Sequence, residues 1–182
     1  MPSNTGQLAT TPANTTPETP WHAAFPAPKL TAEVIPRQRV LQVMSMKIAN
    51  MLLIDVRRTD YEGGTIRGSL NIPAHGFYWN RGTLYELAYK ADIEWVVFYC
   101  GSSNGRGPRC AGWFLEFVRN VAQDPDMQVM VLEGGIKGWV KAGTQFSERM
   151  DGFKAAHWEK VFAEEAETNQ TNAGDVTKLT SN

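Results

Sequence analysis

The clearest candidate for chemistry in this sequence is the thiol of Cys100, which is separated by five residues from Arg106. The residues between them are small or turn-forming: Gly101, Ser102, Ser103, Asn104 and Gly105. Backbone N–H groups of such a loop can turn inward around a tetrahedral oxyanion, and the guanidinium fork of Arg106 can hold two of its oxygens. The same positive field favours the thiolate of Cys100, which is then in line to attack the bound group. The spacing therefore predicts a cysteine nucleophile within an oxyanion-binding loop.

The segments on both sides of this loop are those that such a site needs. Residues 95–99 are β-branched and aromatic and predict a strand. Residues 108–122 begin with proline and carry apolar side chains along one broad face, which predicts a helix. A helix that begins where the loop ends directs the positive end of its dipole toward a bound anion. The alternative is that Cys100 is simply a small buried side chain at the end of a strand.

Two neighbours of the loop allow two interpretations each. Cys110 falls inside the predicted helix, where core packing is the first interpretation and a resolving thiol for an oxidised Cys100 is the second. Arg109 either adds positive potential to the loop or is a solvated residue of the helix.

Other apolar segments alternate in type along the chain. Short apolar runs predict strands over residues 51–56, 69–73 and 128–132. Helical spacing predicts helices over residues 36–50, 83–91 and 136–142. Strands that alternate with helices indicate an α/β domain with a parallel sheet.

The composition excludes several classes of protein. Two cysteines among 182 residues cannot form a disulfide framework or a four-cysteine zinc site, and the three histidines lack zinc-ligand spacing, so we expect no metal. A net charge of −1 and a pI near 6.3 are unlike those of a nucleic-acid-binding domain. The mean hydropathy is −0.34 and no apolar run reaches the ~20 residues of a membrane helix. We therefore expect neither a nucleic-acid nor a membrane partner.

The ends of the chain differ in composition from its middle. Residues 1–28 contain six of the ten prolines and many Thr, Ser and Asn residues, which predicts a disordered arm. This arm resembles neither a secretory signal nor a mitochondrial presequence, so we expect a cytoplasmic protein, with the nucleus also open. Residues 163–182 are polar and predict a flexible tail, which leaves residues 29–162 as the catalytic domain.

Three motifs in order along the chain resemble those of rhodanese-like domains. The first combines Asp55-Val-Arg57 with Gly63-Gly-Thr-Ile66 and Asn71-Ile-Pro73, and the last is Glu133-Gly-Gly-Ile-Lys-Gly-Trp139. The Cys100 loop lies between them. The resemblance implies a single rhodanese-like α/β domain whose central, mostly parallel sheet has helices on both faces. It also implies that Asp55 and Arg57 are structural, with a direct catalytic role as the alternative.

The length of the loop distinguishes branches of this family. Sulfurtransferases of this fold usually have a six-residue active loop, whereas Cdc25-type phosphatases and the similar eukaryotic arsenate reductases have seven residues with Cys-x5-Arg. This sequence has the longer loop, and the Ser, Asn and Arg-Gly-Pro residues in and after it resemble fungal arsenate reductases more than the phosphatases. The resemblance implies that Cys100 attacks arsenate held by Arg106 and the loop amides, that an external thiol such as glutathione or glutaredoxin completes the reduction, and that no cofactor is bound.

Some positions depart from the family pattern and leave other functions open. Tyr99 stands where a histidine is common, Thr65 replaces another histidine, and Gly105 stands where the phosphatases have a glutamate. The loop thus has no acid to protonate a leaving alkoxide. The alternatives are a protein-tyrosine, dual-specificity or small-molecule phosphatase, a thiosulfate sulfurtransferase, and a non-catalytic module that binds anions or partners.

Overall fold

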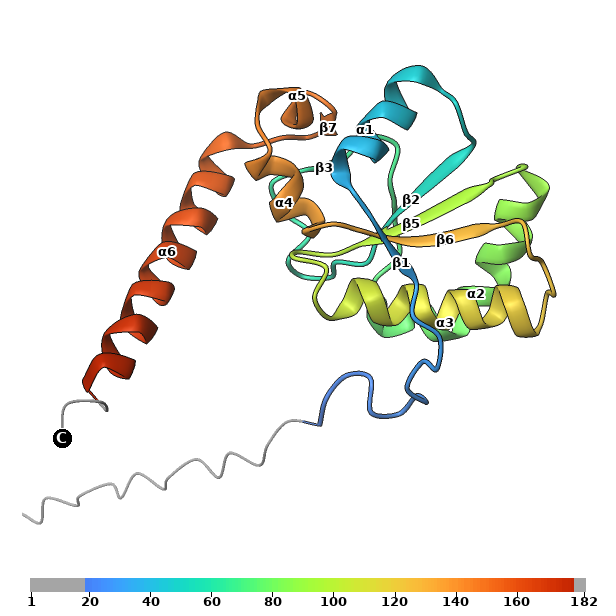
Figure 1. Ribbon diagram of the computed structural model, residues 1–182, viewed down its shortest axis with the longest axis horizontal. Helices are drawn as coiled ribbons and strands as arrows, with labels where there is room; N and C mark the ends of the chain where they lie inside the picture. Colours follow the sequence, from blue (N-terminus) through green and yellow to red (C-terminus); the bar gives the residue numbers. More distant parts are fainter. Residues whose placement is uncertain (1–18, 179–182) are drawn as a thin grey trace, which may run out of the picture.

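Five parallel strands form the central sheet of the computed structural model, which describes residues 19–178, with side chains up to residue 169 (Figure 1). The order across the sheet is β1-β6-β5-β2-β4, and each neighbouring pair is parallel. The strands are Glu33–Ile35 (β1), Met51–Asp55 (β2), Leu70–Asn71 (β4), Trp95–Tyr99 (β5) and Gln128–Leu132 (β6). The strand that precedes Cys100, β5, is the middle one. The predicted α/β fold with a mostly parallel sheet is confirmed.

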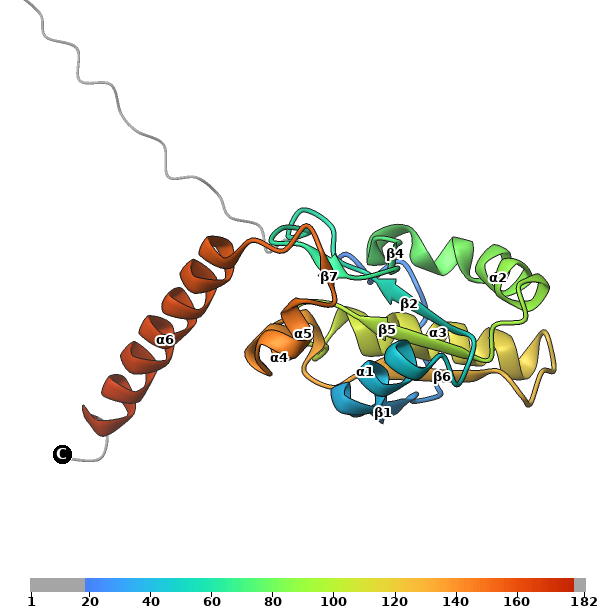
Figure 2. The same ribbon diagram turned by 90° about the horizontal axis from the view of Figure 1, so that it is seen from above.

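Helices cover both faces of this sheet (Figures 1 and 2). They span Arg37–Met46 (α1), Ala74–Lys90 (α2), Arg106–Asn120 (α3), Gly135–Lys141 (α4), Thr144–Ser147 (α5) and Ala155–Lys178 (α6). The side chains of α2 and α3 pack in one core cluster, and those of α1, α4 and α5 pack in a second cluster on the opposite face. The predicted helices on both faces are therefore confirmed.

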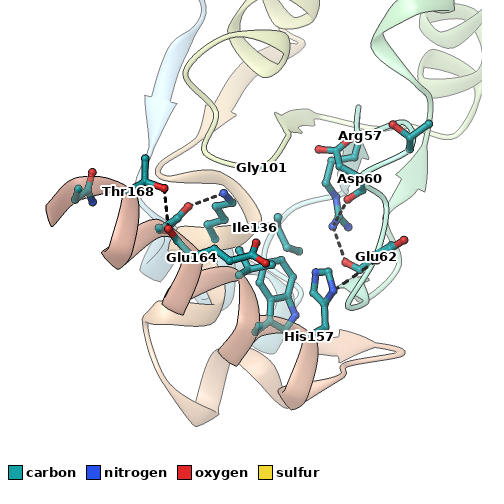
Figure 3. Close-up of a pocket in the computed structure, with 14 residues that line it drawn as sticks. Arg57, Asp60, Glu62, Gly101, Ile136, His157, Glu164 and Thr168 are labelled. Carbon is teal, nitrogen blue, oxygen red and sulfur yellow. Dashed lines mark hydrogen bonds and ion pairs between the residues drawn. The ribbon is translucent and has the colours of Figure 1, made fainter. Parts of the chain in front are cut away.

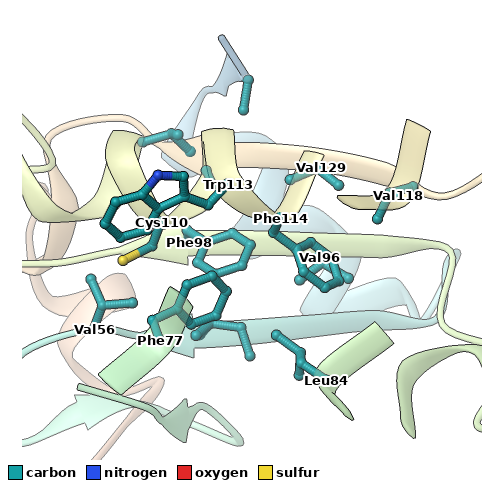
Figure 4. Packing of buried hydrophobic residues seen from close by; sticks show 14 of the residues in the cluster. Val56, Phe77, Leu84, Val96, Phe98, Cys110, Trp113, Phe114, Val118 and Val129 are labelled. Carbon is teal, nitrogen blue, oxygen red and sulfur yellow. The ribbon is translucent and has the colours of Figure 1, made fainter. Parts of the chain in front are cut away.

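Side chains that alternate along β5 contribute to both core clusters. Val96 and Phe98 point toward α2 and α3, where Phe98 and Phe114 lie with ring centroids 5.6 Å apart (Figure 4). Val97 and Tyr99 belong to the cluster on the other face. A strand buried on both faces has a continuous apolar sequence, which is why this segment was recognisable as a strand.

Two helices begin at least two residues earlier than the sequence predicts. α2 begins at Ala74 rather than at residue 83, and it contains Gly82, which weakens the helical signal. A Cβ at Gly82 would lie 3.2 Å from Cζ of Phe117, so this glycine allows α2 and α3 to approach closely. α3 begins at Arg106, and Pro108 lies in its first turn, where a missing N–H costs no hydrogen bond.

A small antiparallel ladder was not predicted. β3 (Thr65–Ile66) pairs with β7 (Met150–Asp151), and two residues are too few for a recognisable strand pattern. The ladder depends on Gly64, which has φ +97° and whose Cβ would lie 2.7 Å from the carbonyl oxygen of Asp151. A side chain at Gly64 would push these strands apart.

The N-terminal part of the described chain differs from the predicted disordered arm of residues 1–28. Residues 1–18 lie outside the described residues, but residues 19–28 lie against the domain. Trp21 and Phe25 pack against the cluster formed by α2 and α3, because two aromatic side chains bury enough apolar area to hold a proline-rich segment in place.

The C-terminal part differs from the predicted tail of residues 163–182 in a similar way. α6 continues without interruption to Lys178 and extends away from the sheet (Figure 2), and residues 179–182 lie outside the described part. At its start, the buried Trp158 donates from Nε1 to the carbonyl oxygen of Gly63 at 2.8 Å. Further along, Glu165 forms ion pairs with two lysines of α4. In the described part of the chain, no helix has the length and apolar character needed to span a membrane.

Candidate active site

The Cys100 thiol lies where the middle strand of the sheet ends. β5 ends at Tyr99, the loop of residues 101–105 follows, and α3 begins at Arg106. Ligands of parallel α/β sheets bind outside the carboxyl ends of the strands. The predicted order of strand, thiol, loop and helix is present in the structure.

The loop rests on the N-terminus of α4. The carbonyl oxygens of Cys100 and Gly101 accept hydrogen bonds from the backbone N–H groups of Ile136 and Lys137, both at 3.0 Å. Gly135 has φ +58°, and a Cβ at this position would lie 2.5 Å from the carbonyl oxygen of Cys100. Gly135, in the motif of residues 133–139, therefore allows α4 to approach and support the thiol loop.

This support determines where the loop amides point. In a trans peptide the N–H points opposite to the C=O, so the N–H groups of Gly101 and Ser102 point away from α4. Within residues 19–178, no group accepts a hydrogen bond from the amides of residues 101–106. Unpaired amide donors at the start of a helix form an anion-binding site.

Two loop side chains differ in their orientation. Ser103 is buried, has φ +58°, and its Oγ accepts a hydrogen bond of 3.4 Å from the backbone N–H of Cys100. Its hydroxyl therefore fixes the turn of the loop. The side chain of Asn104 is exposed and is absent from the residues that line the cavity described next.

A cavity of about 550 Å³ opens at the thiol. The loop contributes Cys100, Gly101, Ser102, Gly105 and Arg106 to its lining, and the other lining residues are Trp21, His22, Asp60, His75, Arg109 and Lys137. Three cationic side chains and one carboxylate line this cavity, and the two arginines, Arg106 and Arg109, are the cations that could face an anion there. Arg109, which sequence alone left open, lies at the cavity.

The guanidinium of Arg106 forms a two-pronged ion pair with Asp60. Its Nη1 and Nη2 lie 2.7 and 2.5 Å from the two carboxylate oxygens. This hydrogen bonding lowers the pKa of Asp60 to about 2 and raises the pKa of Arg106. Arg106 is therefore charged, and an anion that binds it must share it with Asp60 or displace Asp60.

Asp55 and Arg57 form a buried pair behind the site. The Arg57 guanidinium donates to both carboxylate oxygens of Asp55, with a shortest distance of 2.7 Å. It also donates to the carbonyl oxygens of Glu62, at 3.0 Å, and Gly64, at 2.7 Å. Both side chains of the pair are almost fully buried. The pair thus ties the loop that carries Asp60 to the end of β2.

Tyr99 and Cys110 are both enclosed. The hydroxyl of Tyr99 lies 2.7 Å from the hydroxyls of Thr65 and Ser69 and faces the side of the sheet opposite to α3. Burial raises the pKa of Tyr99 and, strongly, that of the Cys110 thiol. Cys110 is inaccessible in the core cluster of α3 (Figure 4), and its protonated thiol is a poor nucleophile at neutral pH.

A second, larger cavity of about 770 Å³ lies between α6 and the loop that carries Asp60 and Glu62 (Figure 3). It shares Asp60, Gly101 and Lys137 with the cavity at the thiol. Lys137 donates to Glu165 of α6 at 2.5 Å. The charge of Lys137 is thus directed toward α6 rather than toward the thiol.

Several lining residues escaped the sequence analysis. Asp60 lies between the Asp55-Val-Arg57 and Gly63-Gly-Thr-Ile66 parts of the first motif, but its pairing with Arg106 joins positions 46 residues apart. Composition places Trp21 and His22 in the predicted disordered arm, and the sequence around His75 shows only that it lacks zinc-ligand spacing. The available signal for contact with the domain is the presence of two aromatic residues, Trp21 and Phe25, within a proline-rich segment.

The sequence of this chain is similar to those of known proteins. The sequence profile of the Rhodanese-like domain family matches residues 40–142. Rice (Oryza sativa subsp. japonica) Arsenate reductase 2.1 is 33% identical over 107 residues, which cover 57% of this chain and 64% of that protein. The Dual specificity phosphatase Cdc25 of Arabidopsis thaliana is 32% identical over 97 residues, which cover 52% and 64%. The chain thus matches less than two thirds of the length of these relatives.

Solved structures show the same fold at low sequence identity. A yeast protein tyrosine phosphatase of the rhodanese family superposes with a TM-score of 0.58 at 22% identity, covering 71% of this chain and 98% of that one. An As-Sb reductase from Leishmania major gives a TM-score of 0.51 at 23% identity, covering 61% and 78%. With the family profile matched from α1 to the end of α4 and the thiol loop at the centre of the matched region, this chain belongs to the rhodanese-like domain family.

Proposed function

We propose that this protein is an arsenate reductase that uses Cys100 as its nucleophile and a small external thiol as its reductant. The observation that carries the proposal is the row of amides over residues 101–106, next to the thiol and at the start of α3, for which the described part of the chain offers no acceptor. Such amides are preorganised donors for the oxygens of a tetrahedral anion. Arg106 supplies the charge that complements the anion.

The reaction begins with attack of the Cys100 thiolate on dihydrogen arsenate. An S–As bond forms, an As–O bond breaks, and the two protons of the arsenate leave with that oxygen as water. Glutathione then attacks the Cys100 sulfur, so an S–S bond forms and the S–As electron pair passes to arsenic. Arsenic(V) becomes arsenic(III), released as hydrogen arsenite with the glutathione proton. A second glutathione, directly or through glutaredoxin, reduces the mixed disulfide and forms glutathione disulfide.

The carboxylate at the cavity does not supply the general acid that a phosphoester would use. An alkoxide leaving group needs a proton from a nearby acid, and Asp60 is the carboxyl group that lines this cavity. Its hydrogen bond with Arg106 lowers its pKa to about 2, so it is ionised at neutral pH and has no proton to give. Dihydrogen arsenate carries its own protons to the leaving oxygen.

A phosphatase is the second candidate, and similarity to the Arabidopsis Dual specificity phosphatase Cdc25 favours it. Two of the curated relatives are arsenate reductases.

Reduction by glutathione would suit the cytoplasm or nucleus, where thiols are kept reduced.

Three assays on one preparation test the proposal. They measure arsenate-dependent oxidation of glutathione with glutaredoxin present, hydrolysis of an aryl phosphate, and sulfur transfer from thiosulfate to cyanide. We expect turnover in the first assay, its loss in Cys100→Ser, and its retention in the matched Cys110→Ser variant. Aryl phosphate hydrolysis without arsenate reduction would establish the phosphatase, and sulfur transfer alone would establish a sulfurtransferase. Full arsenate turnover by Cys100→Ser would overturn the assignment of the nucleophile.

A further inference from the structure

Residues 19–28, which we call the strap, are anchored to the two helices beside the thiol loop. Nε1 of Trp113 in α3 donates to the carbonyl oxygen of Pro26 at 2.7 Å. The ring of Phe25 stacks on Tyr78 of α2 with centroids 4.9 Å apart. The strap thus connects α2 with α3.

A glycine in α3 makes room for the end of the strap. A Cβ at Gly112 would lie 2.7 Å from Cβ of Pro28 and 2.8 Å from the carbonyl oxygen of Leu30. The close approach of chain and helix requires glycine at this position. The strap is therefore fitted to α3 by backbone shape as well as by aromatic contacts.

The anchored strap places two side chains at the thiol. Two successive turns, from Pro20 to Ala23 and from His22 to Phe25, hold this part of the strap. The Trp21 ring lies 4.9 Å from the ring of His75 and 6.1 Å from that of Trp113. Trp21 and His22 then line the same cavity as Cys100.

We propose that the strap determines which substrates reach Cys100, with Trp21 as its specificity-determining residue. Trp21 contacts His75 of α2 and Trp113 of α3, and it bounds one side of the cavity. A free tetrahedral oxyanion fits inside this boundary, whereas a phosphorylated side chain must bring its own backbone to the rim. The strap therefore restricts the site to small, unattached oxyanions and excludes phosphoproteins.

This inference rests on the proposed oxyanion chemistry at Cys100, but it is tested by access to the thiol and by binding, so neither measurement needs turnover. The first measurement compares alkylation of Cys100 by iodoacetamide and by a bulky fluorescein derivative of it, read by mass spectrometry. In the full chain, Trp21→Ala is expected to raise the ratio of bulky to small reagent rates at least fivefold. The matched control is Tyr89→Ala, which removes an exposed aromatic ring at the opposite end of α2 and is expected to leave the ratio unchanged.

The second measurement uses the unreactive Cys100→Ser background and compares inorganic arsenate with a phosphotyrosine peptide. We expect Trp21→Ala to strengthen peptide binding at least fivefold and to change arsenate affinity less than twofold. If Trp21→Ala fails to fold, the same two measurements are made on His22→Ala, which leaves the aromatic anchors in place. Equal alkylation ratios and equal peptide binding in the variant and the wild type would overturn the inference. If Trp21→Ala changes both the alkylation ratio and the peptide affinity as expected, but the protein does not reduce arsenate, the proposed function alone is overturned.

Discussion

The ion pair between Arg106 and Asp60 leads to a quantitative prediction about anion affinity. The guanidinium that should hold the oxyanion is already bonded by both of its terminal nitrogens to the Asp60 carboxylate. Asp60 also places a negative charge in the cavity that receives the anion. Asp60→Asn removes that charge and keeps the size of the side chain, so we expect oxyanions to bind more tightly.

The strength of the pair sets the size of the effect. The hydrogen bond with Arg106 lowers the pKa of Asp60 from 3.8 to about 2, which corresponds to about 2 kcal/mol at 1.36 kcal/mol for each pH unit. The Asp60 side chain is 45% exposed, so solvent screens the pair and about 1 kcal/mol is the appropriate estimate. A difference of about 1 kcal/mol is about a fivefold change in a dissociation constant.

The assay is calorimetric titration of arsenate and phosphate into the Cys100→Ser protein, with and without Asp60→Asn, at low ionic strength. The matched control is Asp151→Asn, which breaks the exposed pair with Arg67 outside the cavity and should leave the affinity unchanged. Weaker anion binding in Asp60→Asn would refute the reasoning. It would mean that Asp60 orients Arg106 for the anion instead of competing with it.

Three further substitutions test the framework of the site. Gly135→Ala places a Cβ against the carbonyl oxygen of Cys100 at φ +58°, so we expect a loss of at least 1–3 kcal/mol in unfolding free energy and loss of activity, measured by urea denaturation and turnover. Arg57→Met leaves its buried carboxylate partner unpaired and should cost about 3–5 kcal/mol; a cost below 1 kcal/mol would contradict the buried pair. Burial lowers the pKa of His75 below its ordinary value of 6.5, so the unfolded chain binds a proton at a higher pH than the folded chain does. This difference lowers the free energy of unfolding as the pH falls below 6.5. His75→Gln should therefore lose less stability than the wild type between pH 7 and pH 5, and equal losses would contradict the assignment.

The parts of the fold that the sequence predicts are those with strong local patterns. β2, β5 and β6 are continuous apolar runs because both faces of each are covered, and α3 has a proline in its first turn and one apolar face. The Cys-x5-Arg loop is equally local, since seven consecutive residues contain the thiol, the amides and the guanidinium.

The parts that the sequence does not predict depend on contacts between distant positions. The strap is held by Trp113, which lies 87 residues from Pro26, and α6 is held by the hydrogen bond of Trp158 to Gly63, 95 residues away. Composition alone predicts a disordered arm over residues 1–28 and a flexible tail from residue 163, because the average over a polar stretch does not register single anchors such as Trp21 or, just before the predicted tail, Trp158. The cavity at the thiol needs the strap, so its shape could not be predicted from the loop.

The thiol loop of residues 100–106 and the Gly-Gly motif of residues 133–139 form one anion-binding site in the folded chain. Loop carbonyls that accept hydrogen bonds from another element are not available to the amides of their own loop. The N–H groups of Ile136 and Lys137 take the carbonyls of Cys100 and Gly101, and Gly135 allows the approach that makes this possible. The Gly-Gly motif therefore keeps the amides of the thiol loop free. The same geometry implies that a substitution that breaks these two hydrogen bonds should reduce anion affinity more than it reduces the reactivity of the Cys100 thiol. Binding of the substrate and the chemistry of Cys100 therefore depend on different parts of the loop.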